Sequence, residues 1–131
     1  MKKSPMEHTR AWLKEQGYLY DTVERFIQTG DGGFRRDMFK FGDIVALAPL
    51  PAIGVLAIQV CSVKDRLEHI RKILHTADIN EAATAWLERK NRLEVWGWRK
   101  LSKKGEDGKL WQARKTEFML DEFGSLTIKE L

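Results

Sequence analysis

Residues 43–60 read Asp-Ile-Val-Ala-Leu-Ala-Pro-Leu-Pro-Ala-Ile-Gly-Val-Leu-Ala-Ile-Gln-Val, and this stretch decides the fold. It contains two short, almost continuous apolar runs, 43–48 and 53–60, which are separated by Pro49-Leu50-Pro51-Ala52. Apolar runs of this length are typical of strands that are covered on both faces, and the proline-containing segment between them favours a turn. The stretch therefore predicts a tight antiparallel hairpin of buried strands.

The register of this hairpin places two polar residues opposite each other. If the turn centres on position 51, Asp43 lies eight residues before it and Gln59 eight residues after it. Directly opposed residues have Cβ atoms about 5 Å apart, and Cys61 projects from the same face because it lies two residues beyond Gln59. Buried Asp and Gln are costly unless they are paired or bind a cation. We therefore expect a polar site whose oxygen atoms could hold Mg²⁺.

The residues before the hairpin predict a helix, a strand and a loop. Ser4 is a good N-cap, because a proline follows it at the first helical position and Glu7 lies three residues after it. Gly17 is a natural stop for this helix. Residues 18–27 are rich in aromatic and β-branched side chains, which favours a strand. Residues 28–41 are expected to form a glycine-rich loop.

After the hairpin the hydrophobic period changes from two to about 3.6. Apolar side chains recur every three or four residues over 63–74, which predicts an amphipathic helix with Ser62 as its cap. Asp78, with Glu81 three residues later, resembles the cap of a second helix. Residues 92–99 predict a strand that is reached by a helical crossover, so it should run parallel to the second hairpin strand. A hairpin loop at 102–108 then returns the chain as an edge strand over 110–118.

The size and composition of the chain indicate one α/β domain over residues 1–131. With 131 residues, 43% hydrophobic and 32% charged, the chain is of the size and type of a single globular domain. We expect a mixed central sheet flanked by helices, with an extra C-terminal edge strand. No apolar run reaches ~18 residues and no signal peptide is recognisable, so no membrane is expected as a partner. The single Cys61 cannot form an internal disulfide and fits a reducing compartment, so we expect a cytoplasmic protein.

Positive charge is concentrated in one part of the chain. Residues 86–115 carry ten Lys or Arg against four Asp or Glu, and they also hold four of the five tryptophans. Cations interleaved with stacking surfaces suit nucleic acid, although a solvated face over core aromatics has the same composition. The candidates for contacts with the nucleic-acid backbone in this basic segment are Arg99, Lys100, Lys103 and Lys104.

The glycine-rich loop offers a second set of cations. Arg35, Arg36 and Lys40 could bind phosphates, because the neighbouring glycines permit close approach of the backbone and the loop leads directly into Asp43. The alternative is a mobile surface loop with solvated charges.

The chain resembles the PD-(D/E)XK nuclease superfamily in its predicted order of elements, which is helix, three strands, helix and strand. Two sequence stretches carry the resemblance: Phe41-Gly42-Asp43-Ile44-Val45-Ala46-Leu47 and Leu56-Ala57-Ile58-Gln59-Val60-Cys61-Ser62. Within this superfamily, the Holliday junction resolvase-like and VRR-NUC-like branches are most similar. The resemblance covers roughly residues 5–100 and implies a restriction endonuclease-like αβββαβ core. It also implies a metal-dependent nuclease that hydrolyses phosphodiester bonds in DNA, namely a Mg²⁺- or Mn²⁺-dependent endodeoxyribonuclease of the junction-resolving type.

The resemblance further implies which residues bind the metal. Asp43 matches the metal-binding Asp, Gln59 the position that adds a side-chain oxygen, and Val60 the position that adds a backbone carbonyl. Two positions depart from the family pattern, because Gln59 is neutral where an acid is usual and Cys61 stands where a lysine is expected. Lys64 could replace that lysine from the start of the next helix, or it could be an ordinary exposed lysine.

Two further acids are candidate metal ligands. Glu24 sits late in the first predicted strand and can approach Asp43, unless it forms a surface ion pair with Arg25. Glu7 loosely matches a first-helix acid of the resolvases, but its position suits the capping partner of Ser4 equally well.

Two functions from different classes follow. The first is the nuclease, with DNA, branched or linear, as its partner; a symmetric junction would favour a two-fold homodimer. The second is a nucleic-acid-binding protein that keeps the fold and has lost catalysis, and Cys61 is the residue that favours it. A purely structural protein would leave the basic segment without a purpose.

Overall fold

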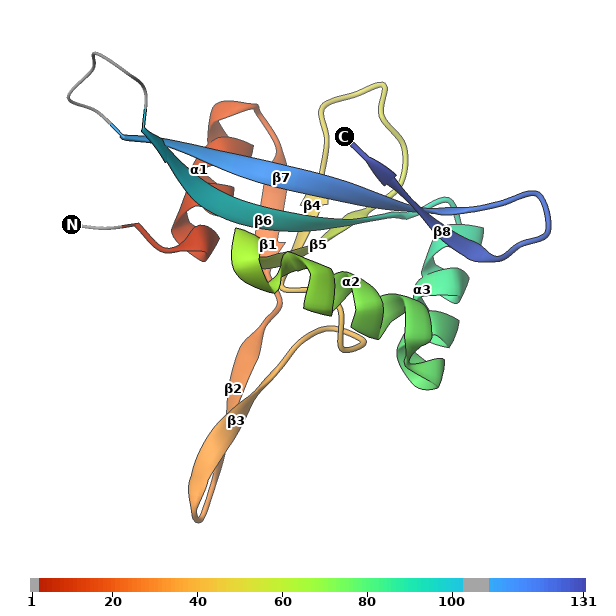
Figure 1. The fold of residues 1–131 in the computed structure, drawn as a ribbon, viewed down its shortest axis with the longest axis horizontal. Helices are drawn as coiled ribbons and strands as arrows, with labels where there is room; N and C mark the ends of the chain where they lie inside the picture. The colour runs from red at the N-terminus through yellow and green to blue at the C-terminus, as the bar shows by residue number, and fades with distance from the viewer. Residues whose placement is uncertain (1–2, 103–108) are drawn as a thin grey trace.

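The computed structural model describes residues 3–102 and 109–131. Within these residues the chain forms three α-helices, one short 3-10 helix and eight strands (Figure 1). In chain order they are α1 (Pro5–Glu15), β1 (Leu19–Thr22), β2 (Arg25–Thr29), β3 (Gly32–Arg36), β4 (Ile44–Leu47), β5 (Leu56–Ser62), η1 (Val63–Asp65), α2 (Arg66–His75), α3 (Ala77–Glu88), β6 (Arg92–Ser102), β7 (Lys109–Leu120) and β8 (Leu126–Glu130).

Six of the strands form one mixed sheet in the order β1-β4-β5-β6-β7-β8. Neighbouring strands are antiparallel, except that β5 and β6 run parallel because α2 and α3 carry the chain across between them. The expected α/β fold with a mixed sheet and flanking helices is therefore confirmed. Among the described residues, no helix is both long and apolar enough to cross a membrane.

Alternate residues of the central strands bury two separate cores. On one side of the sheet α1 packs against a core of Leu13, Ile44, Ala46, Leu56, Ile58, Trp96 and Trp98. On the other side α2 and α3 cover a core of Phe41, Ala57, Cys61, Ile70, Ile73, Ile79, Ala83, Leu93, Val95 and Phe118. Trp96 and Trp98 are only 1% and 6% exposed, so both are core residues and not free stacking surfaces.

The segment before β4 differs from the prediction of one long strand and a loop. β1 ends at Thr22, and the N–H groups of Val23 and Glu24 then both donate to the carbonyl oxygen of Asp43, at 2.9 and 3.2 Å. β2 and β3 pair only with each other, as a two-stranded ribbon that projects from the body of the molecule (Figure 1). The loop predicted over 28–41 is therefore wrong. The turn residues Gly30-Asp31 between two strand-forming segments are a hairpin signal of the kind that two-residue turns require.

Two further predictions, for β7 and for the start of α3, are also wrong. The strand β7 is not an edge strand, because β8 pairs along it. The turn between them is closed by the Asp121 carboxylate, which accepts from the N–H groups of Phe123 and Ser125. Asp78 does not cap α3, which begins at Ala77; its carboxylate binds Lys40 Nζ at 2.8 Å instead. The loop expected at 102–108 lies, apart from its first residue, outside the described residues.

Candidate metal centre

The β4–β5 hairpin has the predicted register. Ile44 pairs with Ile58, so Asp43 and Gln59 take the next opposed positions, and Gln59 Nε2 donates to Asp43 Oδ2 at 2.8 Å. The same carboxylate oxygen accepts the backbone N–H of Val60 at 2.7 Å. Only 3% of Asp43 is exposed, so its carboxylate is buried and held by two donors from β5. The hairpin arithmetic thus predicted the pair, and the structure brings it together.

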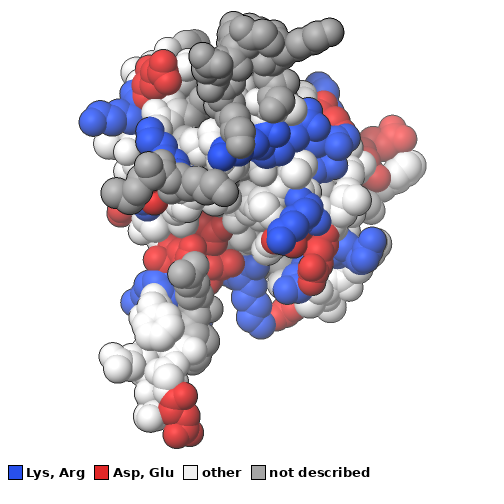
Figure 2. All heavy atoms as spheres, turned by 60° about the vertical axis from the view of Figure 1, so that its left-hand side comes forward, with Lys and Arg blue, Asp and Glu red and all other residues white. Residues whose placement is uncertain are grey.

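Two further carboxylates join Asp43. One ligand oxygen each from Glu24, Asp37 and Asp43 lies within 4.8 Å of the other two, and we call these residues the acidic triad. The ribbon brings the first two together: Arg25 is paired with Arg36, so Glu24 and Asp37 stand at the next opposed positions, at the foot of the ribbon. Figure 2 shows acidic side chains gathered where the ribbon leaves the body. Glu24 was predicted for this site, whereas Asp37 was missed.

The environment of Asp43 favours its protonated form. Burial raises the pKa of the Asp43 carboxyl to about 8, and a hydrogen bond to Asp37 and the negative charges of Asp37 and Glu24 add to the increase. The Val60 N–H acts in the opposite direction and lowers it. A carboxyl with this pKa is mostly neutral at pH 7, and a nearby cation would stabilise its ionised form. The triad is therefore a site where a divalent cation would relieve the mutual repulsion of the carboxylates.

A cleft of about 520 Å³ connects Asp43 and Glu24 with the solvent. Its lining residues are Ser4, Pro5, Met6, Glu24, Arg25, Phe26, Asp43, Val60 and Cys61. The start of α1, the foot of the ribbon and the end of β5 thus meet around the triad. A volume of this size is in the range of small-ligand sites.

Glu7 does not join the triad. Its N–H donates to Ser4 Oγ at 3.2 Å, and the Ser4 hydroxyl lies 3.4 Å from Glu7 Oε1. The structure therefore places Glu7 in the cap of α1, which is the alternative role that its position in the sequence suits.

Cys61 and Lys64 provide no cation at the triad. Cys61 is buried, its thiol donates to the Trp96 carbonyl oxygen at 3.6 Å, and burial together with nearby carboxylates raises its pKa to about 12. It is thus a neutral thiol beside Asp43. Lys64 lies exposed on η1 and is not among the residues that line the cleft.

The predicted nucleic-acid-binding residues lie in different places. Arg36 and Lys40 line a second cleft on the other side of the ribbon foot, and Arg35 lies in β3 opposite Phe26. Arg99 donates to Gln112 at 3.2 Å, and Lys100 Nζ lies 5.4 Å from the centroid of the Trp111 ring. Lys103 and Lys104 lie outside the described residues.

Two cations of the basic segment have structural roles. Lys115 Nζ lies 3.6 and 4.0 Å from the ring centroids of Trp12 and Trp96. Arg92 forms a 3.0 Å ion pair with the buried Glu94. Part of the positive charge of the segment therefore serves packing on the α1 side of the sheet, a role that neither nucleic-acid binding nor a solvated face predicted.

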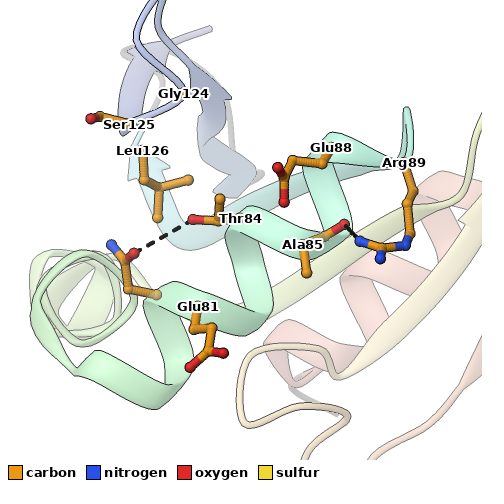
Figure 3. A pocket seen from close by; sticks show the side chains of 9 residues that line it. Glu81, Thr84, Ala85, Glu88, Arg89, Gly124, Ser125 and Leu126 are labelled. Carbon is orange, nitrogen blue, oxygen red and sulfur yellow. Dashed lines mark hydrogen bonds between the residues drawn. The ribbon is translucent and has the colours of Figure 1, made fainter.

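A hollow of about 650 Å³ between α3 and the β7–β8 turn is the weaker candidate site (Figure 3). Its polar groups are used within α3: Thr84 Oγ1 lies 3.5 Å from Asn80 Oδ1, and Arg89 Nη1 donates to the Ala85 carbonyl oxygen at 2.8 Å. These groups do not converge on a common point as the acidic triad does.

Comparisons of the chain with protein-family models, curated proteins and solved structures give no match. The PD-(D/E)XK superfamily therefore stands as a resemblance, and the function is argued from the triad and its surroundings.

Proposed function

We propose that this protein is a divalent-metal-dependent nuclease that hydrolyses phosphodiester bonds in DNA, of the junction-resolving, PD-(D/E)XK-like type. The acidic triad of Glu24, Asp37 and Asp43 is the observation that carries the proposal. Mg²⁺ prefers a few carboxylate or carbonyl oxygens together with several waters. The strand order β1-β4-β5-β6, with its single parallel pair after a helical crossover, supports an αβββαβ core of the restriction endonuclease-like kind.

The triad and two residues of β5 would have different roles in binding the metal. Asp43, Glu24 and Asp37 would bind Mg²⁺ or Mn²⁺ through their carboxylate oxygens. The Val60 N–H binds Asp43, and in an antiparallel pair the carbonyl of the same residue faces the same neighbouring strand. The Val60 carbonyl would therefore be available as a fourth ligand, as the resemblance implies. Gln59 presents an N–H to Asp43 and would position this carboxylate, while its Oε1 is the side-chain oxygen that the resemblance implies as a ligand.

The remaining residues of the cleft would position the phosphate. A bound divalent cation would supply a water of lowered pKa and offset charge on a phosphate oxygen. Arg25 lines the cleft next to Glu24, where its guanidinium could bind a neighbouring phosphate of the strand. The first turn of α1 forms the opposite wall.

The second candidate function is nucleic-acid binding without catalysis. The neutral, buried Cys61 favours it, because the position next to the metal ligands then has no fixed positive charge to offset the phosphate. Lys64 is exposed and is not among the residues that line the cleft.

A cleavage assay separates the two functions. Purified protein is incubated with a four-way junction and with linear duplex DNA, in Mg²⁺, in Mn²⁺ and in EDTA. We expect metal-dependent cleavage that Asp43→Asn abolishes, while Glu68→Gln, a change of an exposed acid on α2, leaves the rate unchanged. The Asn variant keeps the size of the side chain and an oxygen for the Val60 N–H, so the fold should survive. DNA binding by the wild-type protein without cleavage in either metal would establish the second function instead.

A further inference from the structure

A second cleft, of about 950 Å³, lies between the ribbon foot, the turn at residues 37–41 and α3, and it shares Asp37 and Arg25 with the candidate metal centre and its cleft. Its lining includes Arg25, Arg36, Phe39 and Lys40, together with Asp37 of the acidic triad. Because Asp37 belongs to both, this cleft leads directly to the candidate metal centre. We call it the aromatic cleft.

Phe39 forms an exposed aromatic surface in the aromatic cleft. It is 59% exposed, although its ring also packs against Phe41 and Trp86, with centroids 5.9 and 6.4 Å away. Its φ of 52° and that of Lys40, 65°, are in the left-handed region that bulky residues rarely adopt. The turn thus holds a large apolar ring, partly open to solvent, on a fixed support in the aromatic cleft.

Two arginines stand side by side next to this ring. Arg25 and Arg36 are directly opposed in the ribbon and both are exposed. Within residues 3–102 and 109–131 neither of them forms an ion pair or a side-chain hydrogen bond. Like charges that face each other across a strand pair destabilise it, so an anion between the two guanidinium groups would stabilise the foot of the ribbon.

The two acids of the aromatic cleft do not oppose an anionic ligand strongly. Asp78 is neutralised by Lys40, whose Nζ lies 2.8 Å from its carboxylate. Asp37 shares a hydrogen bond with Asp43, and a cation at the triad would balance its charge. Arg25 and Arg36 are therefore the charges of the aromatic cleft that an anionic ligand would meet, once a cation balances the acidic triad.

We propose that the aromatic cleft binds an unpaired nucleotide of a DNA strand, with its base on Phe39 and its phosphates at Arg25 and Arg36. Stacking on an aromatic side chain beside cations is how proteins bind single strands. A paired base inside a duplex is covered on both faces by its neighbours, and a blunt duplex offers an open face only at its two ends, so a single strand offers many more bases to this ring. The inference rests on the proposed function, because it names the substrate of that nuclease. The preferred substrate is DNA with a single-stranded segment next to the scissile phosphate, and not a blunt duplex.

Binding in Ca²⁺ tests this inference with the charge of the triad balanced, and a gel of the recovered oligonucleotide checks that it is intact. The fluorescence anisotropy of a labelled oligothymidylate and of a blunt duplex is measured with the wild type, Phe39→Ala, Phe39→Trp and Phe123→Ala. Phe123 is 85% exposed in the β7–β8 turn, so it is the matched control. We expect Phe39→Ala to weaken binding of the single strand about tenfold or more, Phe39→Trp to retain it and Phe123→Ala to leave it unchanged.

The role of the two arginines in phosphate binding is tested by salt dependence. Replacing Arg25 and Arg36 together by Gln should lower the slope of log affinity against log salt by about 0.7 for each phosphate that the variant no longer neutralises. The same change at Arg71 and Lys72, exposed cations of α2, should not alter the slope.

Each outcome decides the inference. The inference would be overturned if Phe39→Ala and Phe123→Ala bound the single strand equally well, or if Phe39→Trp bound it as weakly as Phe39→Ala. It would also be overturned if the wild type bound the blunt duplex more tightly than the single strand. Cleavage by the wild type that is unaffected by Phe39→Ala would leave the nuclease proposal standing and remove this one. Binding of the single strand that depends on Phe39, without cleavage in either metal, would support this inference and remove the nuclease proposal.

Discussion

Asp43 carries the largest electrostatic cost of the candidate site, and its burial determines how the metal-free protein responds to pH. Gln59 and Val60 hold its carboxylate, but Asp37 and Glu24 repel its charge. The pKa of Asp43 is about 8 in the folded protein, against 3.8 for an ordinary Asp side chain. Between these values the folded chain binds more protons than the unfolded chain, so the free energy of unfolding falls as the pH rises.

We therefore expect the metal-free protein to be more stable at pH 5 than at pH 8, by on the order of 3–4 kcal/mol from this residue. Asp43→Asn carries no titrating proton, so it should remove this part of the pH dependence. Urea unfolding at pH 5, 6.5 and 8 in EDTA measures the difference between the two proteins. Parallel pH profiles for wild type and variant would show that Asp43 is ionised in the folded protein at neutral pH.

The elements that sequence could predict are those with a strong hydrophobic pattern. The buried runs of β4 and β5 predicted their own pairing, and with it the contact between Asp43 and Gln59. The ribbon was missed because β2 buries little of its surface, so its sequence has no clear hydrophobic period. Asp37 was missed with it, since only the pairing about Gly30-Asp31 places it opposite Glu24.

The C-terminal strand β8 was missed for a different reason. It is a short strand at the edge of the sheet, and besides its ladder with β7 it makes a side-chain contact with α2 that no local pattern indicates. Arg66 of α2 is buried, and its Nη1 donates to Thr116 Oγ1 at 2.6 Å and to Glu130 Oε1 at 3.0 Å. A cation between the helix and the last two strands thus holds β8 against the sheet.

Arg66→Ala should therefore destabilise the protein by about 2–4 kcal/mol, because it removes two charge-assisted hydrogen bonds and leaves a cavity between α2 and β7. Arg71→Ala, a change of an exposed arginine on the same helix, should cost less than about 0.5 kcal/mol. Thermal or urea unfolding of both variants checks this. Equal stability of the two variants would show that the Arg66 network contributes nothing to the attachment of β8.

At the scale of the whole molecule, the acidic triad and the surrounding positive charge lie on one side. Figure 2 shows Lys and Arg side chains across the body on the same face as the acidic group at the ribbon foot. A DNA backbone would be attracted by the cations on either side of the triad, while a divalent cation would neutralise the triad itself. With this charge distribution, one DNA molecule could contact the candidate metal centre, the ribbon and the aromatic cleft together.

Binding of a divalent cation at the acidic triad is the central claim, and isothermal titration calorimetry of Mn²⁺ and Mg²⁺ at pH 8 tests it most directly. The wild type should bind one ion, and Asp43→Asn, Asp37→Asn and Glu24→Gln should each weaken the affinity about tenfold or more, because each removes one carboxylate ligand. Glu68→Gln should bind as the wild type does. Equal affinity in the wild type and in Asp43→Asn would contradict the account, because the ion would then bind elsewhere.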